Sequence, residues 1–203
     1  MNHTRVLKLG GSLLSLPDWP NRLRRWLTQH PCQLNLLLCG GGEIVEAVRG
    51  LDAAVELPPE FVHWICIDLL SSTTRIAGQL LPEFPIVTDG QALAQVLEQR
   101  KRGYDSTTSG VVNYLVEVSS FYSPGAPFAM LTEDWNTTSD SLAAYLACVV
   151  EADELVLLKS VSQPAGAETP AAWCALGIVD ANFSRVIGNG CAARIVNLKG
   201  DQE

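Results

Sequence analysis

The sequence predicts an α/β fold in which a mainly parallel sheet is covered by helices on both faces. Short apolar runs of strand length alternate along the chain with segments whose apolar residues recur at helical spacing. Repeated strand-helix-strand order requires crossover connections, and these place helices on the faces of a parallel sheet. Two of the predicted strands end directly in glycines, at Gly10-Gly11 and at Gly40-Gly41-Gly42. These turns therefore fall at strand ends.

The first half of the chain contains two units of strand, glycine turn and helix. The first strand is expected at residues 6–9 and the second at 34–39, a nearly continuous apolar run typical of a strand covered on both faces. Asp18, before Pro20, is a start signal for the first helix. The apolar positions with helical spacing are Leu23, Trp26 and Leu27 in the first helix and Ile44, Val45, Val48 and Leu51 in the second.

The alternation continues through the rest of the chain. Pro82 stops a longer helix over 61–81, Asp89 caps a helix that carries Leu93, Val96 and Leu97, and Thr138 or Ser139 caps another. Strands are expected at 84–87, 111–118, 155–158 and 194–198, a loop or small excursion at 163–177, and a short helix at 182–186. The pattern shows no internal repeat or linker, which predicts one domain over residues 1–203.

Composition narrows the possible partners and the location. A 203-residue chain with 47% hydrophobic residues can bury a sizeable core. Its formal charge of -8 argues against a nucleic-acid or anionic-membrane surface, since both require a broad basic face. No apolar run approaches the roughly 20 residues of a membrane span, and no signal peptide is visible. The six cysteines form no CxxC pair, so we expect reduced thiols, no dedicated metal site and a cytoplasmic protein.

The two glycine turns predict an anion-binding edge. In an open parallel sheet, ligands gather at the carboxyl ends of the strands. Glycine has no Cβ, so phosphate oxygens can approach the backbone N–H groups of Gly10, Gly11, Ser12 and Gly40 to Gly42. Lys8, two residues before Gly10, projects beside the first turn, and Lys159 ends the predicted strand at 155–158. Each lysine could equally be an ordinary surface residue.

A polar segment precedes one of the predicted helices. Residues 135–141 place hydroxyls, an amide and one carboxylate, Asp140, at a helix N-terminus. Asp140 could simply complement the helix dipole. Six polar residues in a row, at 136–141, exceed what one cap requires, which favours a functional segment.

Three motifs together resemble the amino acid kinase family, which includes acetylglutamate, uridylate, carbamate and isopentenyl phosphate kinases. The motifs are Lys8-Leu9-Gly10-Gly11-Ser12, Leu38-Cys39-Gly40-Gly41-Gly42-Glu43, and Thr138-Ser139-Asp140-Ser141-Leu142-Ala143 before the strand that ends at Lys159. The resemblance covers the chain from Val6 to about Val161. It implies a three-layer αβα sandwich whose first half binds the acceptor and whose second half binds ATP.

The resemblance also implies a role for each motif. Lys8 and Gly10 to Ser12 would hold the transferred phosphate, Gly40 to Gly42 would line the acceptor site, Asp140 would orient the catalytic lysine, and Lys159 would lie near the nucleotide. ATP and Mg²⁺ are the implied cofactors, and a homo-oligomer is expected. Catalysis would consist of positioning and charge neutralisation, without a protein nucleophile.

Within the family, the chain looks similar to archaeal-type kinases whose acceptor is itself a phosphate. His63-Trp64-Ile65 on the long helix and Trp135 before Ser139-Asp140 carry this similarity, and the small furan phosphate kinase of methanofuran synthesis is the nearest resemblance. It implies a phosphorylated acceptor in methanofuran- or tetrahydromethanopterin-linked one-carbon metabolism. His63 would contact the acceptor phosphate, with Trp135, Thr138 and Ser139 also at the acceptor, although a lone histidine is more often a packing residue.

The chain departs from the family pattern at two places. Larger members carry a second catalytic lysine in a Gly-Gly-Met segment, which is absent here, and 160–164 reads Ser-Val-Ser-Gln-Pro where an Asp-Gly pair is usual. Two alternatives therefore stay open beside the phosphate-acceptor kinase. One is a catalytically impaired, ligand-binding or regulatory member of the fold, and the other is a kinase with a carboxylate acceptor.

Overall fold

The computed structural model describes residues 3–102, 111–125, 131–188 and 191–200. Its centre is a six-stranded sheet in the order β3-β4-β2-β1-β5-β6, and every strand pair within the described residues is parallel. The strands are β1 (Thr4–Leu9), β2 (Leu34–Cys39), β3 (Ile86–Val87), β4 (Val112–Val116), β5 (Glu154–Lys159) and β6 (Ala192–Asn197). The sheet confirms the predicted α/β class.

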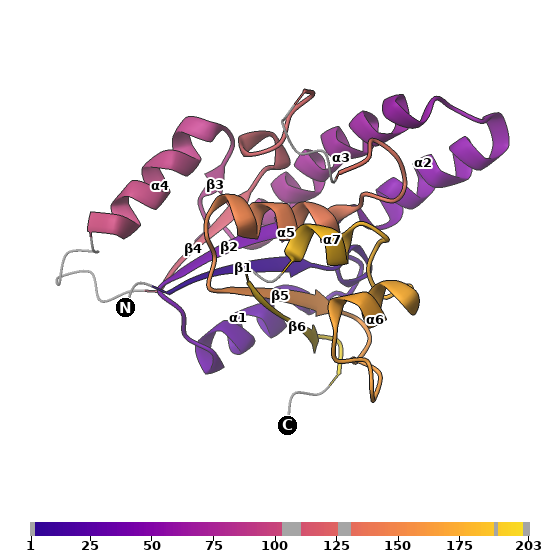
Figure 1. The fold of residues 1–203 in the computed structure, drawn as a ribbon. Helices are drawn as coiled ribbons and strands as arrows, with labels where there is room; N and C mark the ends of the chain where they lie inside the picture. The colour runs from indigo at the N-terminus through magenta and orange to yellow at the C-terminus, as the bar shows by residue number, and fades with distance from the viewer. Residues whose placement is uncertain (1–2, 103–110, 126–130, 189–190, 201–203) are drawn as a thin grey trace.

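Helices cover both faces of this sheet (Figure 1). Helix α1 and the C-terminal part of α3 lie on one face, with α5 and α7 on the other, and α2 lies beside α3 beyond the strand ends. The helices are α1 (Trp19–Gln29), α2 (Gly42–Val55), α3 (Pro59–Leu80), α4 (Gly90–Arg102), α5 (Ser139–Val149), α6 (Pro170–Ala175) and α7 (Phe183–Ile187), with 3-10 turns η1 (Gly11–Leu13) and η2 (Val118–Ser120). The architecture is therefore the predicted three-layer αβα sandwich.

Two apolar cores result from the alternation of side chains along the strands. On β1, Leu7 and Leu9 face α1 and pack with Leu23 and Trp26. Val6 faces the opposite side, where it belongs to the core formed with α3, α5 and α7. Within the part of the chain that the structure describes, no helix is long and apolar enough to cross a membrane.

Most predicted elements are found within a few residues of their expected bounds, and the differences have local causes. Strand β4 is shorter than predicted because the chain turns into η2 at Val118. Asp89 caps α4 by accepting from the Ala92 N–H at 2.8 Å. Asp18 does stand at the N-cap of α1 but makes no side-chain capping bond; its carboxylate accepts from the Asn21 side chain instead. The excursion at 163–177 contains the short helix α6.

Candidate active site

The two glycine turns meet at the carboxyl ends of neighbouring strands. Strand β1 pairs with β2 in a register that sets Leu9 opposite Cys39, so the turns that follow lie side by side. A Cβ on Gly11 would come within 2.2 Å of the Gly42 backbone nitrogen, and one on Gly40 within 2.7 Å of the Gly11 nitrogen. The backbones of the two turns are thus packed against each other, which only residues without a side chain allow.

The prediction that all the N–H groups of these turns face a phosphate is wrong for Gly10 and Gly40. The Gly10 N–H donates to the Leu158 carbonyl and the Gly40 N–H to the Leu9 carbonyl, each at 2.8 Å. These bonds extend the sheet ladder by one residue beyond the strands. Gly11, Ser12, Gly41 and Gly42 line the neighbouring cavity, so an anion would meet this second half of each turn.

A buried carboxylate between two lysines lies beside the turns. Lys8 shares a strand face with Val6, and Lys159 shares one with Leu157, so both side chains point toward α5. Asp140, in the first turn of α5, forms an ion pair with Lys8 (Oδ1 to Nζ, 2.9 Å) and with Lys159 (Oδ2 to Nζ, 2.7 Å). Lys159 also donates to the Ile178 carbonyl at 2.8 Å. We call these three residues the Lys-Asp-Lys cluster.

The cluster carries more positive than negative charge. Burial works against ionisation of Asp140, yet the charges of Lys8 and Lys159, and their hydrogen bonds, outweigh it and lower the pKa of the carboxyl. Burial is also the main influence on Lys159, and together with repulsion from Lys8 it lowers the pKa of that ammonium group against the attraction of Asp140. An anion placed beside the lysines would relieve this repulsion.

Asp180 anchors the polar segment and was missed in the sequence analysis. Its carboxylate accepts from the Thr138 N–H at 3.0 Å, from the Thr138 hydroxyl at 2.7 Å, and from both the N–H and the hydroxyl of Ser141. It also accepts from the N–H groups of Asn182 and Phe183, each at 3.1 Å. One carboxylate therefore ties the N-terminus of α5 to α7. Nothing in the sequence indicates that Asp180 reaches Thr138.

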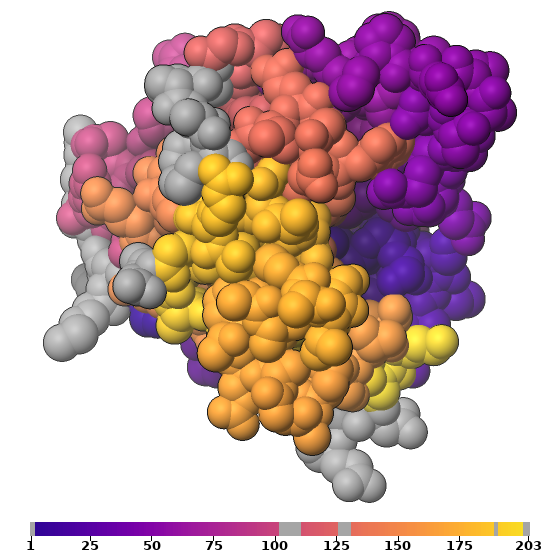
Figure 2. Space-filling view, turned by 45° about the vertical axis from the view of Figure 1, so that its right-hand side comes forward, coloured from indigo at the N-terminus to yellow at the C-terminus, as the bar shows by residue number. Residues whose placement is uncertain are grey.

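A cavity of about 420 Å³ opens next to the cluster, between η1, α2, α3 and the segment 134–139. Figure 2 shows this face hollowed beside α2, in purple, with indigo N-terminal residues at the floor of the hollow. Much of its wall is apolar, from Val45, Val62, Ile67, Leu70 and Leu142. Ser139, the neighbour of Asp140, lines it as well, so the cluster adjoins the cavity.

Trp135, Thr138 and Ser139 all line the cavity, as the acceptor role predicted for them requires. The Trp135 indole N–H donates to the Asp52 carboxylate at 2.7 Å, which ties the segment to α2. Thr138 is also the N-cap of α5 and accepts from the Asp140 N–H at 3.3 Å. Ser12, on the opposite side, exchanges a hydrogen bond of 2.9 Å with Ser160.

His63 reaches the cavity wall but is not free to act as a cation. The ring is buried, and its Nε2 lies 3.1 Å from the Tyr122 hydroxyl. Burial lowers the pKa of the imidazole, against smaller influences from Glu133 and Asp134 that raise it. Burial raises the pKa of the Cys66 thiol, also in the wall, to about 11, which disfavours the thiolate form.

The donor groups of the two lysines suit the oxygens of an anion such as a phosphate. Each lysine Nζ carries three N–H donors, of which the described contacts take one from Lys8 and two from Lys159. Among the described residues there is no group of three or more His, Cys, Asp or Glu side chains arranged for a metal ion. Mg²⁺ is commonly held by one or two carboxylates together with substrate phosphates, so it does not require such a group.

The parallel sheet, its helical layers and its basic carboxyl edge define an α/β protein of the three-layer class. Among solved structures, the UMP kinase from Ureaplasma parvum has a TM-score of 0.66 at 12% identity, covering 97% of this chain and 90% of that one. The UMP kinase from Bacillus anthracis has a TM-score of 0.66 at 13% identity, covering 98% of this chain and 89% of that one. The uridylate kinase from Archaeoglobus fulgidus has a TM-score of 0.60 at 16% identity, covering 96% of this chain and 91% of that one.

The chain therefore has the UMP kinase fold, which is the amino acid kinase fold that its three motifs predict. No protein-family model matches the sequence, and a search of curated proteins gives no significant match. The finer resemblance, to furan phosphate kinases, stays a prediction.

Proposed function

We propose that the chain is an ATP-dependent phosphotransferase whose acceptor is a small phosphorylated metabolite. The observation that carries this proposal is the Lys-Asp-Lys cluster, which offers two ammonium groups at the edge where the glycine turns meet. The first half of the chain would bind the acceptor in the cavity, and the second half would bind ATP. The fold shared with UMP kinases supports the same reading.

The two lysines and the aspartate of the cluster have different tasks in this proposal. Lys8 and Lys159 neutralise the charge that spreads over the phosphoryl oxygens during transfer. Asp140 fixes both Nζ atoms at hydrogen-bond distance from its own oxygens and so sets their positions before substrate arrives. Gly11, Ser12, Gly41 and Gly42 allow the phosphates to approach the backbone closely. Bound Mg-ATP would supply the phosphoryl group and further neutralise its charge.

A second candidate is a member of the fold that binds ligands without catalysis. It is motivated by the absent Gly-Gly-Met lysine and by the altered segment 160–164. The position of Lys159 weighs against it, because this residue already gives Asp140 a second lysine partner, at 2.7 Å. A carboxylate acceptor is the other alternative, and the assay below separates it from a phosphate acceptor. A place in one-carbon metabolism is a further expectation from the furan kinase resemblance.

The test is ADP release by the purified chain with Mg-ATP and a panel of acceptors: furan monophosphate, isopentenyl phosphate, UMP and acetylglutamate. We expect turnover with a phosphate acceptor, and a fall in kcat of roughly 100- to 1000-fold in Lys8→Met, the range seen when one transition-state donor is removed. Lys199→Met, an exposed lysine near the C-terminus, is the matched control and should keep full activity.

Nucleotide binding without ADP release on any acceptor would favour the non-catalytic alternative. Turnover with acetylglutamate alone would favour the carboxylate acceptor. Full activity in Lys8→Met would contradict the proposed role of the cluster.

A further inference from the structure

The acceptor cavity contains one guanidinium group among its described lining residues, that of Arg49. Among the described residues that line the cavity, Arg49 is the one lysine or arginine. His63, the other candidate cation, is buried, bonded to Tyr122 and shifted toward its neutral form. An acceptor anion would therefore find its positive partner within this cavity at Arg49.

Arg49 is held in place by its neighbours. Its guanidinium carbon lies 3.9 Å from the centroid of the Trp135 ring, a stacking distance for a cation on an aromatic face. Trp135 is in turn fixed to α2 by the 2.7 Å bond from its indole N–H to Asp52. Stacking uses the flat face of the guanidinium and leaves its N–H edges free for hydrogen bonds.

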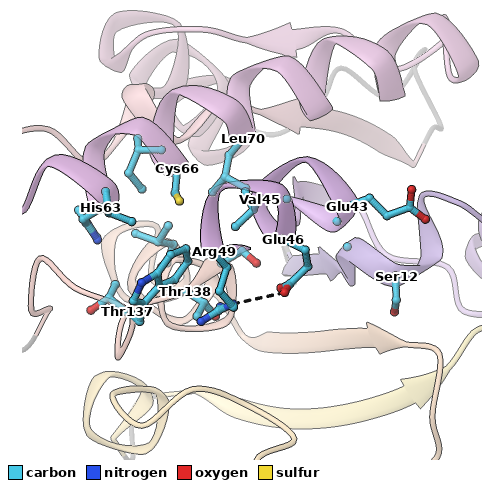
Figure 3. Close-up of a pocket in the computed structure, with 18 of the residues that line it drawn as sticks. Ser12, Glu43, Val45, Glu46, Arg49, His63, Cys66, Leu70, Thr137 and Thr138 are labelled. Atoms are coloured by element: carbon cyan, nitrogen blue, oxygen red, sulfur yellow. Dashed lines mark ion pairs between the residues drawn. The ribbon is translucent and has the colours of Figure 1, made fainter. Parts of the chain in front are cut away.

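One of these edges is occupied and the other is open. Glu46 lies 3.3 Å from Nε, and no other described residue is recorded as a partner of the guanidinium. Figure 3 shows Arg49 among the residues that line the cavity, with the dashed ion pair running to Glu46. The terminal nitrogens are thus available to an oxyanion in the cavity. Thr138 and Ser139 line the same cavity and directly precede Asp140, so the cavity that holds such an anion adjoins the Lys-Asp-Lys cluster.

The rest of the cavity limits what can be attached to the anion. Its wall combines the apolar side chains of Val45, Val62, Ile67, Leu70 and Leu142 with polar ones, among them the carboxylates of Glu43, Glu46 and Asp134. The apolar part of the wall offers no partners to a polyhydroxylated body placed against it, and the carboxylates leave Arg49 as the side chain that attracts an anion. Polar groups buried there without partners would weaken binding. A volume of about 420 Å³ suits a compact molecule.

We propose that Arg49, stacked on Trp135, is the specificity-determining cation of the acceptor site, and that it selects a compact phosphate monoester with an apolar body. This inference rests on the proposed function, which assigns the cavity to the acceptor. Arg49 contacts the acceptor anion directly, and Trp135 positions Arg49.

The experiment is calorimetric titration of the full chain with benzyl phosphate, which has an apolar ring, and ribose 5-phosphate, which has a polar body. Wild type should bind benzyl phosphate at least tenfold more tightly. Arg49→Gln should lose roughly 10- to 100-fold in benzyl phosphate affinity, the range for a hydrogen bond to a charged group. Arg49→Lys should recover only part of this loss because an ammonium group cannot stack and bind bidentately. Arg25→Gln, an exposed arginine on α1, should match wild type.

A double-mutant cycle with Trp135→Leu separates the two residues. If Trp135 acts through Arg49, the double variant should bind benzyl phosphate with the same affinity as Arg49→Gln, to within about twofold. The losses of the two single variants should then not add. Equal affinity of Arg49→Gln and wild type would overturn the proposal. Equal affinity for the two phosphates, or no binding of benzyl phosphate to wild type, would do the same.

Titration of each sample with a non-hydrolysable ATP analogue separates this inference from the function on which it rests. Analogue binding with no effect of Arg49→Gln on benzyl phosphate would overturn only the acceptor assignment. Failure of the analogue to bind wild type would overturn the proposed function itself.

Discussion

The Lys-Asp-Lys cluster and the cavity beside it are built in opposite ways. The cluster consists of buried charges that satisfy one another, on two neighbouring strands and the helix above them. The cavity wall combines buried side chains such as Val62 and Leu142 with more exposed ones such as Arg49, from segments far apart in the chain. The comparison suggests that the cluster provides the chemistry while the cavity determines which molecule receives it. The predictions below separate these two contributions.

The largest effect on stability should come from Asp140→Asn. This substitution leaves two lysines in a buried site without their counterion, and breaking a buried pair typically costs about 3–5 kcal/mol. Because the folded-state pKa of Asp140 lies below its ordinary value of 3.8, its stabilising contribution is present above that pH and is lost as the pH falls through the lower folded value. In urea unfolding, the difference from wild type should be constant from pH 7 to 5 and shrink below pH 4. A difference that disappears already near pH 6 would contradict the charge assignment.

A smaller loss is expected from Asp180→Asn, which tests whether the cluster depends on its support. The amide offers one acceptor oxygen where the carboxylate offers two, so part of the bonding to Thr138, Ser141, Asn182 and Phe183 is lost, at a cost of about 1.5–3 kcal/mol. In the phosphotransfer assay kcat should fall while the KM of the acceptor stays nearly constant, since Asp180 positions α5 rather than touching substrate.

Asp18→Asn is the matched control, because Asp18 stands at the N-cap of α1 without capping it through its side chain. It should change stability by less than about 0.5 kcal/mol. Equal losses in both variants would mean that Asp180 is an ordinary surface carboxylate.

The contact between the glycine turns is tested by Gly42→Ala. Gly42 has a φ of +57°, and a Cβ there would lie 2.8 Å from the Gly11 carbonyl oxygen. Gly166 also has a positive φ, of +81°, but nothing lies within 4 Å of its Cβ position. Gly166→Ala therefore reports backbone strain alone, and Gly42→Ala should be further destabilised by about 1–3 kcal/mol through overpacking. Equal thermal unfolding of the two variants would show that the turns can separate without cost.

The smallest effect is expected at His63. Because the pKa of this buried imidazole is lowered, the ring is neutral near pH 7 and adds little to the binding of an anion. The ratio of benzyl phosphate affinities between wild type and His63→Gln should stay within about threefold, near 0.7 kcal/mol, from pH 6 to 8. Comparing the two proteins at each pH cancels the titration of the phosphate itself. A ratio that rises steeply toward pH 6 would show that His63 binds the phosphate as a cation.

Sequence alone predicts the sheet and the cluster better than the cavity, for a physical reason. Lys8, Asp140 and Lys159 each stand at a strand end or a helix start, where local patterns predict the element and parallel topology brings the ends together. Arg49 and Asp180 belong to no such pattern. Arg49 acquires its role from Trp135, 86 positions along the chain, and Asp180 from Thr138, to which it is bonded across 42 positions.

The hydrogen-bond partners of the glycine turns could not be predicted from the sequence either. A glycine N–H can bind an anion or extend a ladder, and only the register of β1 with β2 and β5 shows that Gly10 and Gly40 do the latter. The difference depends on tertiary pairing rather than on residue type.

The central claim is that the lysines of the cluster receive the phosphates of ATP. A crystal structure of the chain with Mg²⁺ and a non-hydrolysable ATP analogue tests it most directly. The account predicts terminal phosphate oxygens at about 3 Å from the Nζ atoms of Lys8 and Lys159, with the Asp140 ion pairs retained. A nucleotide bound elsewhere, with neither lysine contacting a phosphate oxygen, would contradict it.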